Sequence, residues 1–543
     1  MNHSIDNLIN ELTLEEKAAM LAGADMWRTV AVDRLGIPAI QVSDGPNGVR
    51  GMDDNIGKTS VCFPVGVAMG ATWNPELIEQ VGLALAAEVR AKGAHMLLAP
   101  TVNIHRTPIA GRNFECFAED PYLNGTIAAA YINGLQKQGV SACIKHFVAN
   151  DQEFERFSIS SEVAERPLHE IYLEPFRLAL EKANPWSVMS AYNRINGTFA
   201  SENDPLLRDL LKDSWGYDGL VISDWYGTYS DGVINSALDL EMPGPARWMD
   251  PEKIVTAVTN GDLDEASLDD KIRRLFRLIE RVTKRRELIP TSEQLPREVA
   301  AEAIVLLKNE SDLLPLNPDK PQTIAVIGEN AKWAQIMGGG SSQVNPHRAV
   351  SPLEGIQQRA GEALTVAYAF GTVVHRQPPL IDPAWLTAVD GQSSGLTLSY
   401  FHNLDLSGEP AHTAVVGKSE LAWFGTVNPF VDPTHFSLRL QGTLTVPESG
   451  TYQLQMWSIG QARLAVDGDV VLDQWAGDLD QRTAVDLTLE ANKPVSILVE
   501  YVTDSDSRWR TLRLGCVPPL PADPIQTAVE LAAQADVAIV VAG

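Results

Sequence analysis

Apolar positions in the first half of the chain follow two different spacings. After Asn74, apolar side chains recur every three or four residues as far as Gly93, which predicts a helix that Asn74 caps. Short, nearly continuous apolar runs are typical of strands buried on both faces, and they lie at 39–42, 95–100, 140–144, 187–189 and 220–222. Because helices and such strands alternate from about residue 13 to 285, we predict a parallel sheet covered by helices.

Polar, reactive residues follow directly after five of the apolar runs. They are Ser43-Asp44, Asn103 to Arg106, Lys145-His146, Tyr192-Asn193 and Ser223-Asp224. In a closed β/α barrel the carboxyl ends of all strands converge on one face, where active sites lie. A doubly wound open sheet places its ligand at one switch point instead. Five reactive strand ends therefore favour a (β/α)8-type barrel over residues 1–285 with one shared pocket.

The spacing pattern changes twice after the barrel. Residues 286–296 contain two prolines and no regular period, which predicts a linker. An α/β pattern occupies 297–384 and returns in 519–543, whereas alternating strands with turn residues fill 385–518. We therefore predict an α/β sandwich domain interrupted by an all-β insertion.

A hairpin turn and the last strand candidate are two further features that the sequence of the second half predicts. The strand candidate Ala462–Val466 runs into Asp467-Gly468, a strong signal for a two-residue hairpin turn. The last apolar run, Val537–Val541, is followed by only two residues. Since a central strand normally leads into a loop and a helix, we expect the given sequence to be truncated within the α/β sandwich domain.

Composition and charge narrow the class of protein. The chain has 543 residues, of which 45% are hydrophobic and 21% are charged. At roughly 150 residues per domain, this length predicts three or four domains, or fewer large ones, of an ordinary soluble protein. The 70 acidic and 43 basic residues give a formal net charge of −27, which argues against nucleic acid and a membrane surface as partners. The sequence leaves a homo-oligomer open.

The sequence shows no pattern typical of a targeting segment, a disulfide framework or a metal site. The first residues lack the basic start and apolar run of a signal peptide, and no run of 18 apolar residues is present, so we expect a cytoplasmic location. The four cysteines form no CxxC pair and are expected to be buried free thiols. Ten scattered histidines without an HExxH motif predict no metal site, and we expect no cofactor.

Asp224 ends an apolar run and precedes Trp225. A carboxylate in this place can attack an anomeric carbon, and the neighbouring indole offers a stacking face for a sugar. The alternative is a structural carboxylate that caps the next helix. The local pattern leaves both interpretations open.

Lys145, His146 and Arg156 form a cationic group after another apolar run. These side chains could hold sugar hydroxyls and lower the pKa of a nearby carboxylate. Lys145 could instead form a Schiff base, or the group could close the barrel mouth with salt bridges. Asp44 lies on a Gly/Pro-rich turn, where backbone hydrogen bonds alone would account for it. The glycine-rich run 338–342 lacks the lysine of a P-loop and predicts a mobile loop.

Taken together, these segments resemble glycoside hydrolase family 3 over nearly the whole chain. The matching runs are SDGPNGVRG (43–51), NIHRTPIAGRNFECFAEDPYL (103–123), KHFVANDQEFER (145–156), MSAYNRING (189–197), GLVISDW (219–225) and LLKNESDLLPL (306–316). The resemblance implies that Asp224 is the catalytic nucleophile of a retaining β-glucosidase. It also implies a subsite for the cleaved sugar made of Asp44, Arg112, Lys145, His146, Arg156, Met189, Tyr192 and Trp225.

The implied reaction is a double displacement through a glycosyl-Asp224 intermediate on short β-glucosides. An Asp in the SDGPNG run resembles a ligand of sugar hydroxyls and favours glucose over xylose. Family members place the acid/base Glu on a loop of the second domain, and we expect it beyond Gly543. The alternatives are another family activity such as β-xylosidase, a fragment that only binds carbohydrate, and a Schiff-base lyase that uses Lys145.

The all-β segment is similar to the protective-antigen-type domain of some β-glucosidases. The similarity rests on FSLRLQGTLTVPESGTYQLQM (436–456) and ARLAVDGDVVLD (462–473). Such a domain could bind polysaccharide, or it could shape the leaving-group subsite and restrict the enzyme to short glycosides. We favour the second interpretation because the segment is inserted beside the expected acid/base loop.

Overall fold

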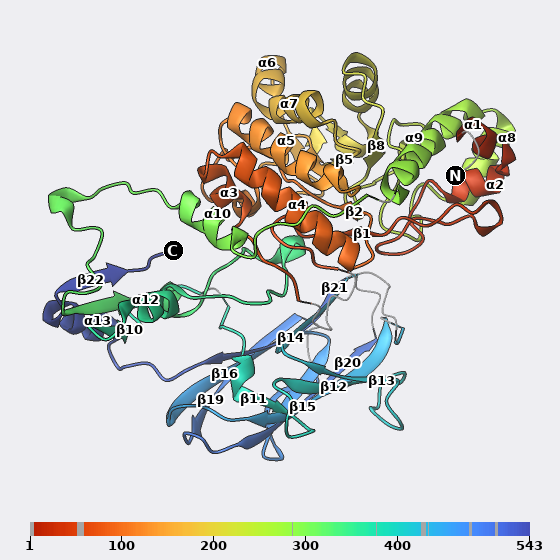
Figure 1. Cartoon of the computed structure of the whole chain (residues 1–543). Coiled ribbons are helices and arrows are strands. Elements are labelled where there is room, and N and C mark those ends of the chain that lie inside the picture. Colours follow the sequence, from red (N-terminus) through yellow and green to blue (C-terminus); the bar gives the residue numbers. More distant parts are fainter. Residues whose placement is uncertain are drawn as a thin grey trace. The chain divides into compact units, whose positions relative to one another are not determined.

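The computed structural model of this chain (Figure 1) describes all residues except 1–4, 52–58, 285, 376, 425–429, 433, 477–479 and 505–508. It contains two compact units. One consists of Met1–Met52, Lys58–Lys308 and Ile336–Arg348, and the other of Asp53–Gly57, Asn309–Gln335 and Ala349–Gly543. The segment Ile336–Arg348 thus belongs to the first unit, although its neighbours in sequence belong to the second.

A five-stranded parallel sheet forms the centre of the first unit. Its order is β1-β2-β3-β5-β8, with the bounds Val42–Ser43, Met96–Leu97, Ser141–Phe147, Ser187–Ser190 and Leu220–Ile222. Every residue of these strands is buried, as the continuous apolar runs predict. β2 covers only two residues of its apolar run 95–100.

Isolated backbone bridges connect the outer edge of β8 with that of β1. They are Ile222–Leu240 and Ala22–Glu241, which are parallel, and Gly23–Thr29 and Arg28–Gln41, which are antiparallel. Because two of these bridges are antiparallel, the described residues do not form a regular eightfold repeat of strand and helix. The (β/α)8-type barrel therefore stays a prediction.

Helices cover this sheet (Figure 1). The longer helices of the first unit are α4 (Pro75–Ala91), α5 (Pro121–Lys137), α7 (Glu174–Ala183), η5 (Pro205–Ser214), α8 (Pro251–Asn260), α9 (Glu265–Thr283) and α10 (Leu295–Ala303). The side chain of Asn74 accepts a hydrogen bond from the Leu77 amide at 3.0 Å and caps α4, as predicted. Shorter elements are α1 (Ile5–Glu11), α2 (Leu14–Ala19), α3 (Gly66–Ala71), α6 (Glu165–Pro167), η1 (Asp33–Leu35), η2 (Asn113–Glu115), η3 (Leu168–Tyr172), η4 (Ala200–Glu202) and η6 (Asp231–Ile234). A small sheet adds β4 (Ser160–Ser161), β6 (Arg194–Ile195) and β7 (Thr198–Phe199).

The second unit contains a three-stranded parallel sheet in the order β10-β9-β22. The bounds are Leu364–Ala369, Gln322–Ile327 and Val537–Val540. Its helical elements are α11 (Glu329–Lys332), α12 (Pro352–Ala360), α13 (Pro524–Gln534), η7 (Glu310–Asp312) and η9 (Pro383–Trp385). The short turn η8 (Gly340–Ser342) follows α11 in sequence but lies in the first unit. The predicted α/β pattern is confirmed for these elements.

Two antiparallel sheets account for the predicted all-β segment. One has the order β13-β12-β15-β20-β17-β18 with β11 paired to β15, and the other the order β14-β21-β16-β19. The bounds are β11 Leu386–Ala388, β12 Leu396–Phe401, β13 His412–Val416, β14 Glu420–Phe424, β15 His435–Leu444, β16 Gly450–Ile459, β17 Gln461–Val466, β18 Asp469–Gln474, β19 Asp480–Leu489, β20 Val495–Asp504 and β21 Trp509–Val517. One hydrophobic cluster contains inward-facing residues of both sheets, such as Leu438 and Leu454. The two sheets thus form a sandwich, which in sequence lies between β10 and β22.

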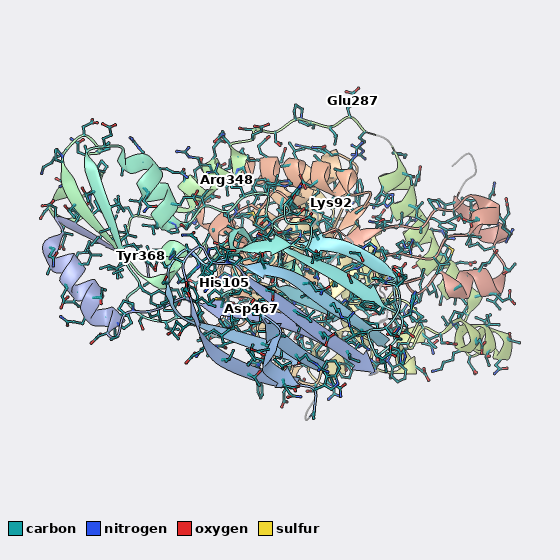
Figure 2. All side chains as sticks on the ribbon, turned by 90° about the horizontal axis from the view of Figure 1, so that it is seen from below. Lys92, His105, Glu287, Arg348, Tyr368 and Asp467 are labelled. Atoms are coloured by element: carbon teal, nitrogen blue, oxygen red, sulfur yellow. The ribbon has the colours of Figure 1, made fainter. Side chains whose placement is uncertain are left out.

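The predicted hairpin turn joins β17 and β18. Asp467 (labelled in Figure 2) and Gly468 both have positive φ, 49° and 92°, as a two-residue turn of this kind requires. The protective-antigen-type identity and the domain boundaries stay predictions, and residue 285, the predicted end of the barrel, lies outside the described residues.

Two further expectations concern thiols and membranes. All four cysteines lie in described segments and are free thiols; Cys116, Cys143 and Cys516 are buried, whereas Cys62 is only partly buried. Within the described part of the chain, no helix is both long and apolar enough to pass through a bilayer.

Candidate active site

The carboxyl ends of the central strands bring the predicted site residues into contact with one another. Lys145 Nζ lies 2.9 Å from Asp44 Oδ1, and His146 Nε2 lies 3.4 Å from Asp224 Oδ2. Backbone hydrogen bonds align the strand that carries Lys145 with the neighbouring one, since the Lys145 amide donates to the Pro100 carbonyl at 3.0 Å. Residues at or just after the carboxyl ends of β1, β3 and β8 therefore share one site, as the strand-end pattern predicts.

Asp224 follows β8 and is buried. Its Oδ1 atom accepts a hydrogen bond from the Trp225 amide at 2.7 Å, and its Oδ2 atom accepts none from the part of the chain that the structure describes. Burial raises the pKa of Asp224, whereas the nearby cations Arg112, Arg156 and Lys145 lower it. The next helical element, η6, is capped by Ser230. The alternative that Asp224 caps the next helix is therefore wrong.

Lys145 and Asp44 form a buried ion pair. Their side chains are only 2% and 8% exposed, and Asp44 Oδ1 also accepts a hydrogen bond from the Gly45 amide at 2.8 Å. Asp44 therefore does more than stabilise its own turn. Since Lys145 Nζ is engaged by a carboxylate, the geometry favours an ion pair over the Schiff-base alternative.

Asn103 holds His146 in place through three hydrogen bonds. Its amide nitrogen donates to the His146 carbonyl at 3.0 Å, and its Oδ1 accepts from the His146 amide at 3.1 Å. The same Oδ1 lies 3.0 Å from His146 Nδ1. Because the two backbone bonds fix which end of the amide is the acceptor, Nδ1 carries a proton and donates it. Burial lowers the pKa of His146 well below its usual value, and the positive charges of Arg112 and Lys145 lower it further. The Nε2 atom therefore faces Asp224 without a proton.

Asn103 was identified from the sequence only as one of several polar residues after β2. No motif assigns it a role, because its partners are backbone and ring atoms of a residue far along the chain. Tertiary pairing of the segments after β2 and in β3 creates the role: the Val102 amide donates to the Lys145 carbonyl at 2.8 Å.

The two arginines of the predicted subsite are each paired with a glutamate. Arg112 Nε donates a hydrogen bond to the carboxylate of Glu115, whose side chain is only 1% exposed. Arg156 Nη1 lies 2.6 Å from Glu153 Oε2. The sequence interpretation missed both glutamates, although each lies three residues from its arginine, a spacing that could have suggested the pairs. The glutamates hold the guanidinium groups near Asp224.

Aromatic rings line the same region. The Arg156 guanidinium lies 4.5 Å from the centre of the Tyr192 ring, which lies 4.6 Å from that of Phe157. Trp225 donates from its indole nitrogen to the Met26 carbonyl at 3.0 Å. Met189 is fully buried in β5, and its predicted place at the wall of the subsite stays a prediction.

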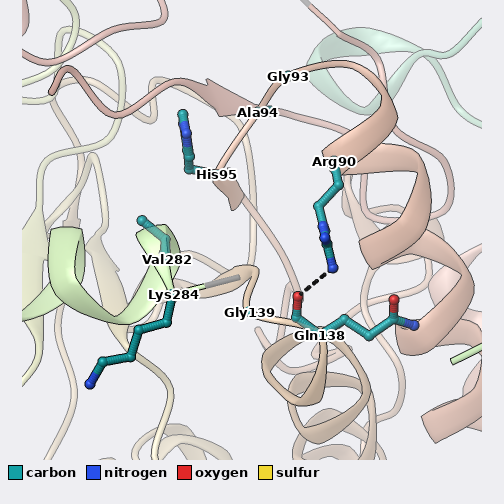
Figure 3. Close-up of a pocket in the computed structure, with 8 residues that line it drawn as sticks. All are labelled: Arg90, Gly93, Ala94, His95, Gln138, Gly139, Val282 and Lys284. Carbon is teal, nitrogen blue, oxygen red and sulfur yellow. Dashed lines mark hydrogen bonds between the residues drawn. The ribbon is translucent and has the colours of Figure 1, made fainter. Parts of the chain in front are cut away.

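A separate cavity of about 200 Å³ lies at the opposite, amino-terminal ends of β2 and β3 (Figure 3). Arg90 points toward the Gln138 carbonyl (Figure 3) and donates to it at 3.3 Å, and to the Arg286 carbonyl at 2.8 Å. Lys284 pairs with Glu280 at 3.0 Å. Because its basic groups are engaged by the protein itself, this cavity is not a candidate site.

The buried Asp151 side chain is expected to make the stability of the fold depend on pH. Its Oδ1 accepts a hydrogen bond from the Ile104 amide at 2.6 Å, and burial raises its pKa from 3.8 to about 7. At pH values between these two pKa values, Asp151 holds a proton in the folded protein that it has released in the unfolded chain. The stabilisation from this group is therefore complete below about pH 4 and is lost as the pH rises through about 7.

We expect the variant Asp151→Asn to flatten the fall in thermal unfolding midpoint between about pH 4 and 7. Differential scanning fluorimetry of both proteins across this range measures the effect. The exposed Asp213→Asn is the matched control and should leave the pH dependence as it is. An identical slope for Asp151→Asn and the unaltered chain would contradict the prediction.

Two family models match this chain. The model described as "Glycosyl hydrolase family 3 N terminal domain" matches residues 2–278, and "Glycosyl hydrolase family 3 C-terminal domain" matches residues 304–543. A protein named "Beta-glucosidase" from Rhizobium radiobacter is 44% identical over 566 residues, which cover 99% of this chain and 67% of the relative. "Beta-glucosidase B" from Emericella nidulans is 38% identical, with 99% and 66% covered. The chain therefore spans about two thirds of the length of these relatives.

Solved structures show the same similarity. The structure described as "Beta-glucosidase from Kluyveromyces marxianus in complex with glucose" matches with a TM-score of 0.91 and 36% identity, covering 99% of this chain and 68% of that one. "DesR, a beta-glucosidase from Streptomyces venezuelae in complex with D-glucose" matches with a TM-score of 0.70 and 29% identity, covering 99% and 67%.

Proposed function

Because this chain belongs to glycosyl hydrolase family 3 and is a glycoside hydrolase, we propose that it is a retaining β-glucosidase acting on short glucosides. The observation that carries the proposal is the environment of Asp224. This carboxylate is buried at a strand end, has one oxygen without a hydrogen bond from the described residues, and is flanked by three cations. Such a group is suited to form a bond to carbon inside a water-poor site.

Asp224 acts first as nucleophile. One of its oxygens forms a bond to C1 of the glucosyl unit while the bond from C1 to the leaving-group oxygen breaks. That oxygen departs with the bonding electrons and takes up a proton from a general acid. Water then adds to C1 and gives a proton back to the same group, while the bond between C1 and the Asp224 oxygen breaks and its electrons return to the carboxylate. Glucose is released in the β configuration after two inversions. Arg112, Arg156 and Lys145 stabilise the charge of Asp224 before attack and after release.

The sugar hydroxyls lie against the charged groups around Asp224. The ion pair of Asp44 and Lys145 offers acceptors and donors to neighbouring hydroxyls, and the guanidinium of Arg112 donates to others. His146 presents the unprotonated Nε2 atom as an acceptor. The similarity to two β-glucosidases that are described in complex with glucose supports glucose as the sugar.

The general acid is the one role for which we name no described residue. Leaving groups of low pKa need little proton transfer in the first step. The test of the proposal therefore uses a 2-fluoro-glucoside with a good leaving group, whose fluorine slows the release of the glycosyl-enzyme more than its formation.

We expect the intact mass of the protein to increase by one fluoroglucosyl unit after incubation with this compound. The corresponding fluoro-xyloside is the matched comparison, because it lacks only the hydroxymethyl group of the sugar. Labelling by the xyloside in preference to the glucoside would replace the proposal by a β-xylosidase. The absence of both adducts would overturn the proposed function. Equal turnover of dinitrophenyl glucoside and of longer glucosides with the same leaving group would contradict the restriction to short substrates.

A further inference from the structure

The glycine-rich run of the sequence belongs to a segment that is bound to the first unit by several contacts. Pro346 of the segment Ile336–Arg348 forms a parallel backbone bridge with Ser60. The Ser60 amide donates to the Asn345 carbonyl at 2.8 Å, and the His347 amide donates to the Ser60 carbonyl at the same distance. Ser342 is buried. The run that predicts a mobile loop is therefore anchored at its carboxyl end.

The same segment contacts two loops that carry predicted sugar ligands. A Cβ atom added to Gly338 would lie 2.4 Å from two atoms of the Phe114 ring, so the glycine lies directly against that ring. The Val344 side chain lies 3.2 Å from the Cβ position of Gly48. Phe114 belongs to the loop of Arg112, and Gly48 belongs to the turn of Asp44.

Each contact lies within four residues of a charged group of the site. Phe114 is the middle residue of η2, and the last residue of that turn, Glu115, pairs with Arg112. On the other side, the Gly48 amide donates to the Gly45 carbonyl at 3.3 Å, and the Arg50 amide donates to the Asp44 carbonyl at 3.0 Å. A shift of the segment would thus move the partners of both Arg112 and Asp44.

We infer that the segment Ile336–Arg348 is a positioning element of the sugar site. It fixes the loops of Arg112 and Asp44 from outside, and Gly338 is a positioning residue because only a residue without Cβ fits against Phe114. This inference rests on the proposed function, since the positioned groups are those that we assign to sugar binding.

The test compares the inactivation kinetics of the full chain with its Gly338→Ala variant, using the activated 2-fluoro-glucoside. We expect the half-saturation concentration for inactivation to rise about tenfold in Gly338→Ala, because a displacement of even one ångström is costly in a preorganised site. The amount of adduct at saturation should stay near one per chain, which shows that the variant is folded. Gly417→Ala is the matched control, because a Cβ there meets no atom within 4 Å.

A second variant separates positioning from a general loss of stability. Removing the ring in Phe114→Ala eliminates the clash, so Gly338→Ala should add no further increase to the half-saturation concentration in the double variant. An unchanged value for Gly338→Ala, or effects that multiply in the double variant, would overturn the inference. If the unaltered chain forms no adduct, the proposed function fails, and the inference fails with it for that separate reason.

Discussion

Replacing Asp224 by alanine is expected to lower kcat for an activated β-glucoside by about 10⁴-fold or more, which corresponds to about 5 kcal/mol of activation free energy. The physical reason is the loss of the carboxylate whose oxygen forms the bond to C1 in the proposed mechanism. The effect on folding should be small in comparison, since the carboxylate is buried at a cost that raises its pKa. Steady-state kinetics and thermal unfolding of the same preparations measure both effects.

Chemical rescue makes this prediction specific to a nucleophile. In Asp224→Ala, azide should occupy the vacated space, attack C1 in a single inversion and yield α-glucosyl azide, which nuclear magnetic resonance identifies. The exposed Asp213→Ala should hydrolyse the substrate at the normal rate and form no azide product. Retention of substantial activity in Asp224→Ala without azide would assign the nucleophile to another residue.

Replacing Lys145 by methionine is expected to have the second largest effect. Both members of the ion pair are almost completely buried and their atoms lie 2.9 Å apart. Without Lys145, the Asp44 carboxylate stays in a site of low polarity without its counter-charge, which costs about 3–5 kcal/mol of unfolding free energy. The activity should fall as well, because Lys145 is proposed to contact a sugar hydroxyl. Urea unfolding and kcat/KM report the two losses.

The double variant Asp44→Asn/Lys145→Met distinguishes the two causes. It removes the uncompensated charge, so it should regain much of the stability that Lys145→Met has lost. Its activity should stay low, because neither charged group is left to bind the sugar. A stable Lys145→Met protein would show that the pair contributes little to the fold, and a fully active double variant would exclude both residues from the sugar site.

The local pattern of the chain was sufficient to predict buried strands of the central sheet and the reactive residues near their ends. Nearly continuous apolar runs predicted most of β3, β5 and β8, because a strand buried on both faces favours apolar residues on both. Lys145 and His146 were expected to follow their strand but lie inside β3 near its carboxyl end. The turn after β17 was predictable for a similarly local reason, since Asp467-Gly468 tolerates the positive φ that a tight hairpin requires. The connection between β8 and β1 was not predictable from such patterns, because it consists of bridges between single residues that have no strand pattern.

The amino-acid sequence by itself determined which residues lie at the strand ends, because burial and turn preferences act between near neighbours in sequence. It thereby also determined which charged side chains are available to a sugar site. Only the tertiary structure decided how those charges are held. The pairing of His146 with Asn103 and the contact of Gly338 with Phe114 join segments that are far apart along the chain. Hydrogen bonds and close contacts depend on distances of a few tenths of an ångström, which packing of the whole unit sets and which no spacing of residues in the sequence encodes.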